Sequence, residues 1–141
     1  MENAFDSFVD YKIITRNNTV VFLFDVLKDY PSPFQWTCAK EDFKKAMEEL
    51  KQLNTNYVYI FDMRLMGLLS INQVKEFVEI LESLSDFLEK KLSYSVVVAE
   101  GAIIKTIYEI MKIFYKTKKP LKIVNTMEQA YQYMDESKLA P

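Results

Sequence analysis

The residues whose type and spacing best suit chemistry are Asp62 and Arg64, an acid and a base two positions apart. They follow an apolar run, 57–61, that is typical of a buried strand, and open α/β sheets place ligand sites at the carboxyl ends of their strands. Such a pair can bind a polar ligand or a polar group of a partner. It can equally form a local ion pair that satisfies the loop backbone. Asp25, which ends the neighbouring strand-like run, could join them.

Most groups that catalysis requires are missing from the composition. The chain has no histidine, which excludes Ser-His and Cys-His nucleophile pairs and any zinc site that uses imidazole. Its two glycines, Gly67 and Gly101, cannot form a G-x-G-x-x-G loop or a P-loop. Without a histidine, Asp25, Asp62 and Arg64 give only weak support for a catalytic mechanism. We therefore expect no enzyme activity, no catalytic residue, no metal and no cofactor.

Two further side chains carry nucleophilic atoms, Ser70 and Cys38. Ser70 and Gln73 have the spacing of a capping box, so Ser70 is expected to be a helix N-cap worth about 1 kcal/mol. A helix N-terminus also favours a phosphate, which leaves a modification site as the alternative. Cys38 could be a reactive thiol, but no partner base is identifiable, which favours a structural cysteine.

Length and composition indicate one ordinary globular domain. The chain has 141 residues, of which 50% are hydrophobic and 27% charged, with a net charge of −2. The start of the sequence is acidic where a secretory signal would be basic, and no apolar run approaches the ~20 residues that cross a bilayer. A single cysteine excludes an intrachain disulfide and suits a reducing compartment. We expect a cytoplasmic protein.

Apolar periodicity predicts strands that alternate with helices. A hairpin turning at Asn17 and Asn18 is followed by an irregular proline-containing stretch, 27–36. The predicted strands are 8–15, 19–26, 57–62, 94–99 and 121–125, and the predicted helices are 38–53, 70–88, 102–116 and one from Thr126 onward. This alternation favours a single α/β domain with a mixed sheet of about five strands. Four of the strands are parallel, the N-terminal strand is antiparallel, and four helices pack against the sheet.

This order of elements resembles the STAS domain, the fold of anti-sigma-factor antagonists and of sulfate-transporter tails. The resemblance covers about residues 8–136. It is clearest at Tyr59-Ile-Phe-Asp-Met-Arg64, at Val96-Val-Val-Ala99 and at 121–130. A related branch, the STAS and Sec14-like domains, has an especially similar Asp-Met-Arg and C-terminal pattern. The resemblance implies a non-enzymatic regulatory module that binds a protein partner.

The antagonist branch of that family implies a switch at the start of the 70–88 helix. Its members carry a phosphorylatable Ser there, usually within Asp-Ser-Ser-Gly, and Ser70 falls at about this place. The preceding Asp, the second Ser and the Gly are missing here, so the switch is degenerate. The surface expected to meet a partner is the loop and helix start from Arg64 through Gly67 and Ser70 to Asn72.

Aromatic side chains follow one another on one face of the predicted strands. By alternation, this face carries Phe22, Phe24, Tyr57, Tyr59, Phe61 and Tyr94, and Val97 and Ala99 fall on the aliphatic face. If the helices pack on the aliphatic face, the aromatic face stays open for a ligand, a dimer partner or the loop 31–36. If helices cover both faces, the rings are core. Crossovers wound in one direction favour a partly open aromatic face.

The predicted helix 102–116 has an unusually wide apolar arc. Tyr108 and Tyr115 widen it, and six lysines but one acidic residue lie between Lys105 and Lys122. The arc could dock a partner protein, a membrane surface or an anionic ligand, with peripheral membrane contact the less favoured of these. Alternatively, the lysines extend around an ordinary core helix near its negative end. The acidic overall charge and the lack of a recognition motif argue against a nucleic-acid partner.

Three functions therefore remain as hypotheses. The first is a regulatory or protein-interaction module that presents the 64–72 surface to a partner, with a homodimer as one form of that contact. The second is a carrier or sensor of a small apolar or lipid-like ligand, suggested by the aromatic set and the Sec14-like branch. The third, an enzyme that uses Asp25, Asp62 and Arg64, has the least support.

Overall fold

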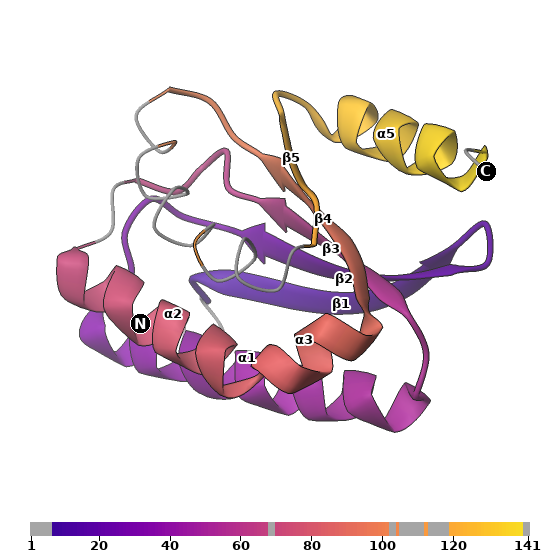
Figure 1. Cartoon of the computed structure of the whole chain (residues 1–141). Helices are drawn as coiled ribbons and strands as arrows, with labels where there is room; N and C mark the ends of the chain where they lie inside the picture. The colour runs from indigo at the N-terminus through magenta and orange to yellow at the C-terminus, as the bar shows by residue number, and fades with distance from the viewer. Residues whose placement is uncertain (1–6, 68–69, 102–103, 105–111, 113–118, 140–141) are drawn as a thin grey trace.

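The computed structural model describes residues 7–67, 70–101, 104, 112 and 119–139, and these form a mixed five-stranded sheet with helices on both faces (Figure 1). The strand order is β1-β2-β3-β4-β5, with β1 antiparallel to β2 and the other neighbours parallel. The strands are β1 Val9–Arg16, β2 Thr19–Val26, β3 Tyr57–Asp62, β4 Leu92–Val98 and β5 Leu121–Val124. The predicted α/β architecture is confirmed.

The β1–β2 hairpin forms where the sequence predicts it. Arg16 pairs with Thr19, so Asn17 and Asn18 alone make the turn, and both have positive φ, 50° and 68°. Asparagine tolerates this left-handed region better than most residues, and two-residue hairpin turns require it.

Helix α1, Pro33–Leu53, begins five residues earlier than the predicted helix 38–53. Proline fits the first turn of a helix because no partner exists there for the missing N–H. Ser32 caps the helix: its side chain accepts a hydrogen bond from Gln35 N, and the Gln35 side chain accepts one from Ser32 N. The prediction of an irregular stretch as far as Trp36 was therefore wrong.

The predicted helix 70–88 is divided into α2, Ile71–Ser83, and α3, Ser85–Lys91. Leu84 interrupts the helix with φ −102° and ψ 6°, which lies outside the helical range. The last helix, α5 Met127–Leu139, starts after Thr126, whose hydroxyl accepts a hydrogen bond from Gln129 N as a capping box predicts. The predicted helix 102–116, with Tyr108 and Tyr115, lies outside the described residues apart from two isolated positions.

Helices α1, α2 and α3 cover the aromatic face of the sheet, and α5 covers part of the opposite, aliphatic face (Figure 1). The expected open aromatic face is therefore wrong, because its rings are core: Phe22, Phe24, Tyr57, Tyr59 and Phe61 are at most 6% exposed. The two described crossovers, through α1 and through α2 and α3, do lie on one side, as their common direction requires. They cover the aromatic side, where burial of large rings removes the most apolar area from water.

Strand β4 presents the opposite faces from those that simple alternation predicts. Tyr57 pairs with Leu92 but Val58 pairs with Tyr94, so a register shift adds one residue to β4. Tyr94 consequently lies on the aliphatic face against Tyr133 of α5, with ring centroids 5.4 Å apart, and Val97 and Ala99 join the aromatic core. A bulge of this kind reverses every side chain beyond it.

Side-chain contacts join the turn of the β1–β2 hairpin to α5. Arg16 and Asn17 each donate a hydrogen bond to the Asp135 carboxylate at 3.3 Å. The Arg16 guanidinium also lies 4.4 Å from the centroid of the Tyr131 ring. The first two strands and the last helix therefore contact each other although more than 100 residues separate them.

Candidate functional site

Asp62 and Arg64 form the local ion pair that the sequence offered as one alternative. Arg64 Nε and Nη2 donate to the two Asp62 oxygens at 2.9 and 2.7 Å, and Arg64 N donates to Oδ1 at 3.3 Å. Asp62 is buried and Arg64 is exposed. The carboxylate is thus largely occupied by its own loop, which leaves the guanidinium edge as the part that can meet another molecule.

The strand register places Asp25 beside Asp62, as predicted, and adds Asp10 on the other side. Asp10 pairs with Asp25 in the hairpin, and Asp25 pairs with Asp62 in the parallel ladder. Burial, together with the Asp62 charge, raises the pKa of the Asp25 carboxyl. Among the described residues, no group of three or more potential ligands has the geometry to bind a metal ion.

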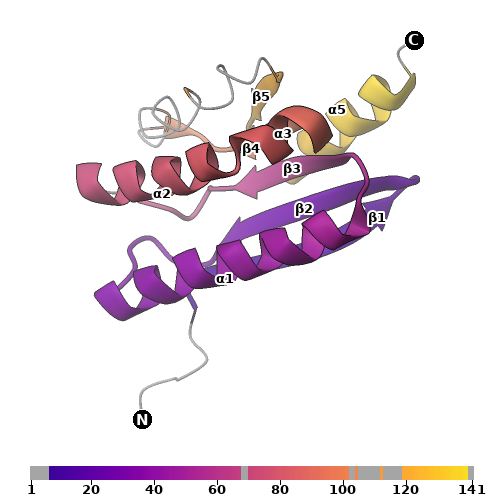
Figure 2. The same cartoon turned by 60° about the horizontal axis from the view of Figure 1, so that its bottom comes forward.

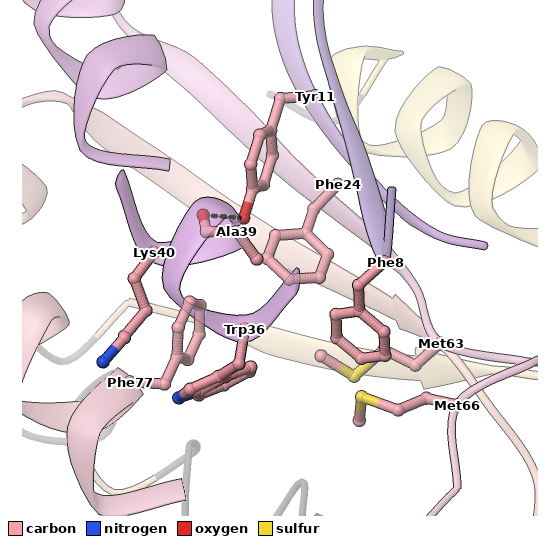
Figure 3. Close-up of a pocket in the computed structure, with 9 residues that line it drawn as sticks. All are labelled: Phe8, Tyr11, Phe24, Trp36, Ala39, Lys40, Met63, Met66 and Phe77. Atoms are coloured by element: carbon pink, nitrogen blue, oxygen red, sulfur yellow. Dashed lines mark hydrogen bonds between the residues drawn. The ribbon is translucent and has the colours of Figure 1, made fainter. Parts of the chain in front are cut away.

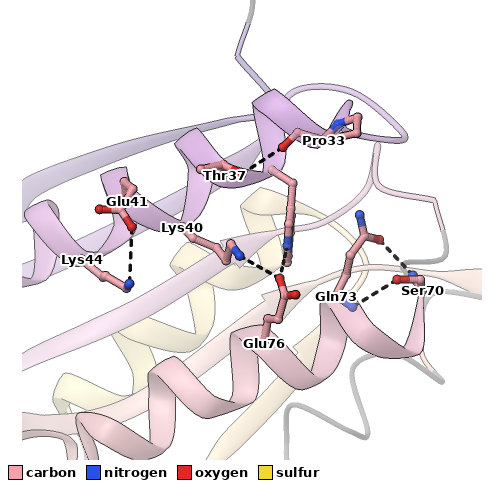
Figure 4. Close-up of polar contacts among 9 residues, drawn as sticks. Pro33, Thr37, Lys40, Glu41, Lys44, Ser70, Gln73 and Glu76 are labelled. Atoms are coloured by element: carbon pink, nitrogen blue, oxygen red, sulfur yellow. Dashed lines mark hydrogen bonds and ion pairs between the residues drawn. The ribbon is translucent and has the colours of Figure 1, made fainter.

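Ser70 is the N-cap of α2, as its spacing predicts. Its hydroxyl accepts a hydrogen bond from Gln73 N at 3.1 Å, and Gln73 Oε1 accepts one from Ser70 N at 2.9 Å (Figure 4). Ser32 makes the same reciprocal pair at the start of α1. Both helices begin at the end of the sheet toward which β2 and β3 point (Figure 2). Neither helix has an acidic residue in its first turn to offset its positive end.

The loops that precede these two helices contact each other through Gly67. Gly67 N donates to the Asp29 carbonyl at 2.8 Å, and the Tyr30 ring lies against the glycine. A Cβ on residue 67 would lie 2.6 Å from Tyr30 Cζ, so only glycine fits without movement of the ring. The predicted partner surface therefore extends to a second loop, between β2 and α1, that sequence reasoning did not include.

Large apolar side chains are exposed on these loops and on the first turns of the helices. We call this set the loop patch: Tyr30 is 58% exposed, Phe34 75%, Leu65 61% and Ile71 85%. Asn72, from the predicted surface, is also exposed in the first turn of α2. Leu53, at the far end of α1, is 51% exposed and offers a natural comparison. The sequence pattern could have indicated Phe34 and Ile71, because each lies within two residues of a capping serine and outside the apolar stripe of its helix.

Polar side chains join α1 to α2 behind the loop patch. Glu76 Oε1 accepts hydrogen bonds from Trp36 Nε1 at 2.7 Å and from Lys40 Nζ at 2.8 Å (Figure 4). The hydrogen bonds from Lys40 and then Trp36 lower the pKa of the Glu76 carboxyl. Trp36 is buried in α1, whereas the sequence predicts an irregular stretch there. Cys38, in the same helix, is half-buried.

The comparisons with known proteins bear on the fold. No protein-family model and no curated protein matches the sequence. The structure is similar to that of an uncharacterized protein of the DUF3478 family from Shewanella loihica PV-4, described as having a SpoIIAA-like fold. The TM-score is 0.61, and the match covers 94% of this chain and 98% of that chain at 10% sequence identity. This chain has a SpoIIAA-like fold.

The SpoIIAA-like fold confirms the resemblance to STAS domains at the level of architecture, since an identity of 10% carries the fold alone. On this scaffold, the loop patch and both capped helix starts lie at the carboxyl ends of β2 and β3. Among the described residues, every helix is too short or too polar to span a membrane.

Proposed function

We propose that this protein is a non-enzymatic interaction module that binds a protein partner through the loop patch. The observation that carries the proposal is the exposure of Tyr30, Phe34, Leu65 and Ile71 at one end of the sheet. Scattered exposed apolar residues are ordinary, but a group of large ones at one end is typical of a contact surface. Aromatic side chains such as Tyr30 and Phe34 often supply most of the binding energy of such surfaces.

Hydrogen bonds support the backbone beneath the loop patch, which favours binding without a large ordering cost. Reciprocal capping pairs fix the first turns that carry Phe34 and Ile71. The hydrogen bond from Gly67 to Asp29 connects the two loops that carry Tyr30 and Leu65. Side chains presented by a fixed backbone lose less conformational entropy on binding.

The polar groups of the site support a binding role better than catalysis. Asp62, the acid best placed for chemistry, already has two hydrogen bonds from the Arg64 side chain. A phosphorylated Ser70 would add a doubly charged group at the edge of the loop patch, which is how a regulatory switch would act on this contact. The second hypothesis, a carrier or sensor of a small apolar or lipid-like ligand, has less support, because five of its aromatic rings, Phe22, Phe24, Tyr57, Tyr59 and Phe61, are core.

Photo-crosslinking tests the proposal. A benzophenone amino acid replaces Phe34, Ile71 or, as the matched control, Leu53, in the cells that produce the protein. We expect the variants at 34 and 71 to yield the same crosslinked protein, identified by mass spectrometry, and the variant at 53 to yield none of it. A crosslink to a second copy of the chain would assign the contact to a homodimer. Equal labelling at all three positions, or none at 34 and 71, would overturn the proposal.

A further inference from the structure

Strand β1 forms one edge of the sheet, and its outer side has no neighbouring strand among the described residues. The Phe8 carbonyl, just before β1, accepts a hydrogen bond from Leu27 N at 2.8 Å. Residues of an antiparallel strand alternate between those that bond to the neighbouring strand and those that do not. Four residues of β1 therefore turn their N–H and C=O groups toward the open edge: Val9, Tyr11, Ile13 and Thr15.

This edge is long, regular and held in place. Strand β1 has eight residues, contains no proline, and pairs with β2 without a register shift. The Tyr11 hydroxyl donates to the Ala39 carbonyl at 2.9 Å, which holds the middle of the strand against α1 (Figure 3). Short strands, prolines and bulges usually keep an edge from pairing. Without them, β1 is a preformed template for one more strand.

The charges of β1 favour a second copy of this chain as the added strand. Charged side chains can also protect an edge, but Asp10 and Lys12 have opposite signs, and their side chains are 46% and 56% exposed. Both lie on the face of the strand opposite to Tyr11. If two β1 strands pair antiparallel with Tyr11 facing Tyr11, Asp10 of each copy lies opposite Lys12 of the other. Four charges then alternate in sign around the two-fold axis.

The backbone favours the same register. Tyr11 turns its N–H and C=O outward, so the two Tyr11 residues can exchange both hydrogen bonds. The flanking pairs of Asp10 with Lys12 are then non-hydrogen-bonded pairs, in which the side chains come closest. Pairing centred on Asp10 or on Lys12 would place identical charges opposite each other. Pairing centred on Ile13 would place Asp10 opposite Arg16, whose guanidinium already donates to α5.

We propose that the protein forms a symmetric dimer in which the two β1 strands pair antiparallel about Tyr11 and join two five-stranded sheets into one. Each Asp10 then has two lysines as neighbours, its own Lys12 at 3.6 Å and Lys12 of the second copy. The dimer contact uses no residue of the loop patch. This proposal and the proposed function can therefore fail independently.

Charge reversal tests the dimer and its register in the full-length protein. Sedimentation equilibrium measures the dissociation constant, and the wild type is expected to be a dimer. Asp10→Lys and Lys12→Asp each place like charges opposite each other at both pairs, and each is expected to weaken dimerisation by about tenfold or more. An equimolar mixture of the two variants again opposes lysine with aspartate. We expect it to form the heterodimer, which native mass spectrometry distinguishes from either homodimer.

Glu89→Lys and Lys90→Glu are the matched controls, because both side chains are exposed on α3, which packs beside β4. Neither should change the dissociation constant, and urea titrations check that all variants remain folded. A monomeric wild type would refute the proposal, as would a mixture that stays monomeric although both variants fold. A dimer that both reversals leave intact would also refute it. So would weakening by Asp10→Lys alone, because the strands would then pair with Asp10 opposite Arg16.

Discussion

At the scale of the residue, Gly67 has the clearest structural reason for its identity. The Tyr30 ring occupies the space where any other residue would place its Cβ. The atoms in the way belong to the end of a flexible, half-exposed side chain, so the ring can move aside at modest cost. Gly67 therefore determines the position of Tyr30 in the loop patch more than it determines stability.

Replacement of Gly67 tests this role. We expect Gly67→Ala to change the free energy of unfolding by less than about 1 kcal/mol, as for a surface substitution, while it reduces crosslinking from position 34. The measurement is a urea titration together with the crosslinking experiment. In the Tyr30→Ala background, Gly67→Ala should have no further effect on either readout, because the clash is gone. Additive effects of the two substitutions would show that the contact does not couple them.

Ser70 allows the helix cap to be separated from a binding role. Ser70→Ala removes the oxygen that accepts from Gln73 N and is expected to cost about 1 kcal/mol of unfolding free energy. Ser70→Asp retains an N-cap acceptor, so its stability should stay close to that of the wild type while it adds negative charge beside the loop patch. Ser32→Ala is the matched control for loss of a cap at the neighbouring helix. A Ser70→Asp protein as unstable as Ser70→Ala would contradict the capping role.

At the scale of the element, local sequence signals predicted strands better than they predicted helix ends. The hairpin at Asn17 and Asn18 and the cap at Ser70 depend on adjacent residues, and both were predictable. The cap at Ser32 has the same Ser-x-x-Gln spacing, but the two nearby prolines favour an irregular chain when the sequence is considered alone. The register shift that places Tyr94 on the aliphatic face depends on pairing between strands, which no local pattern encodes.

The contact between α1 and α2 predicts a pH-dependent contribution to stability. The pKa of Glu76 in the folded protein lies below its value in the unfolded chain, so its contribution is present above that unfolded value and is lost as the pH falls through the folded value. We expect Glu76→Ala to destabilise the protein at pH 7, because the Trp36 N–H loses its acceptor, and to differ less from the wild type at pH 3.

Urea titrations at the two pH values measure this difference. Glu41→Ala is the control, since Glu41 pairs with Lys44 within a single exposed turn of α1 (Figure 4). An exposed pair of this kind contributes little to stability. If Glu41→Ala and Glu76→Ala were equally destabilising at pH 7, the connection between α1 and α2 would have no special role.

At the scale of the whole molecule, the aromatic core makes the fold sensitive to alkaline conditions. Burial raises the pKa of Tyr11, Tyr57 and Tyr59 above the ordinary value. The folded protein therefore keeps these protons at a pH where the unfolded chain releases them. The resulting stability is fully present below about pH 10, the unfolded value, and is lost progressively as the pH rises above it.

A pH series of urea titrations checks this expectation. The unfolding midpoint should stay nearly constant from pH 7 to about pH 9 and fall steeply above pH 10. Tyr59→Phe should make the decline shallower, because it removes one buried hydroxyl. A wild-type midpoint that is constant up to pH 11.5 would contradict the burial of these hydroxyls.

The architecture could be predicted from the sequence because strands that alternate with helices pair in parallel through crossover helices. The sequence could not show which face of the sheet the helices cover, because both faces of β3 are fully apolar until its last residue. The sequence did not predict the whole loop patch, for a related reason. Tyr30 and Leu65 belong to different loops, and only the folded sheet brings their loops together through Gly67 and Asp29.

The position of α5 has a consequence for synthesis of the protein. Ala130 and Met134 pack on the aliphatic residues Val21, Val58 and Ile60, all of which a ribosome makes much earlier. Strands β2 and β3 are therefore synthesised before the helix that packs on their aliphatic side. We expect a nascent chain arrested before Thr126 to expose these valine and isoleucine side chains to chaperones, and to be degraded faster than a chain that includes α5.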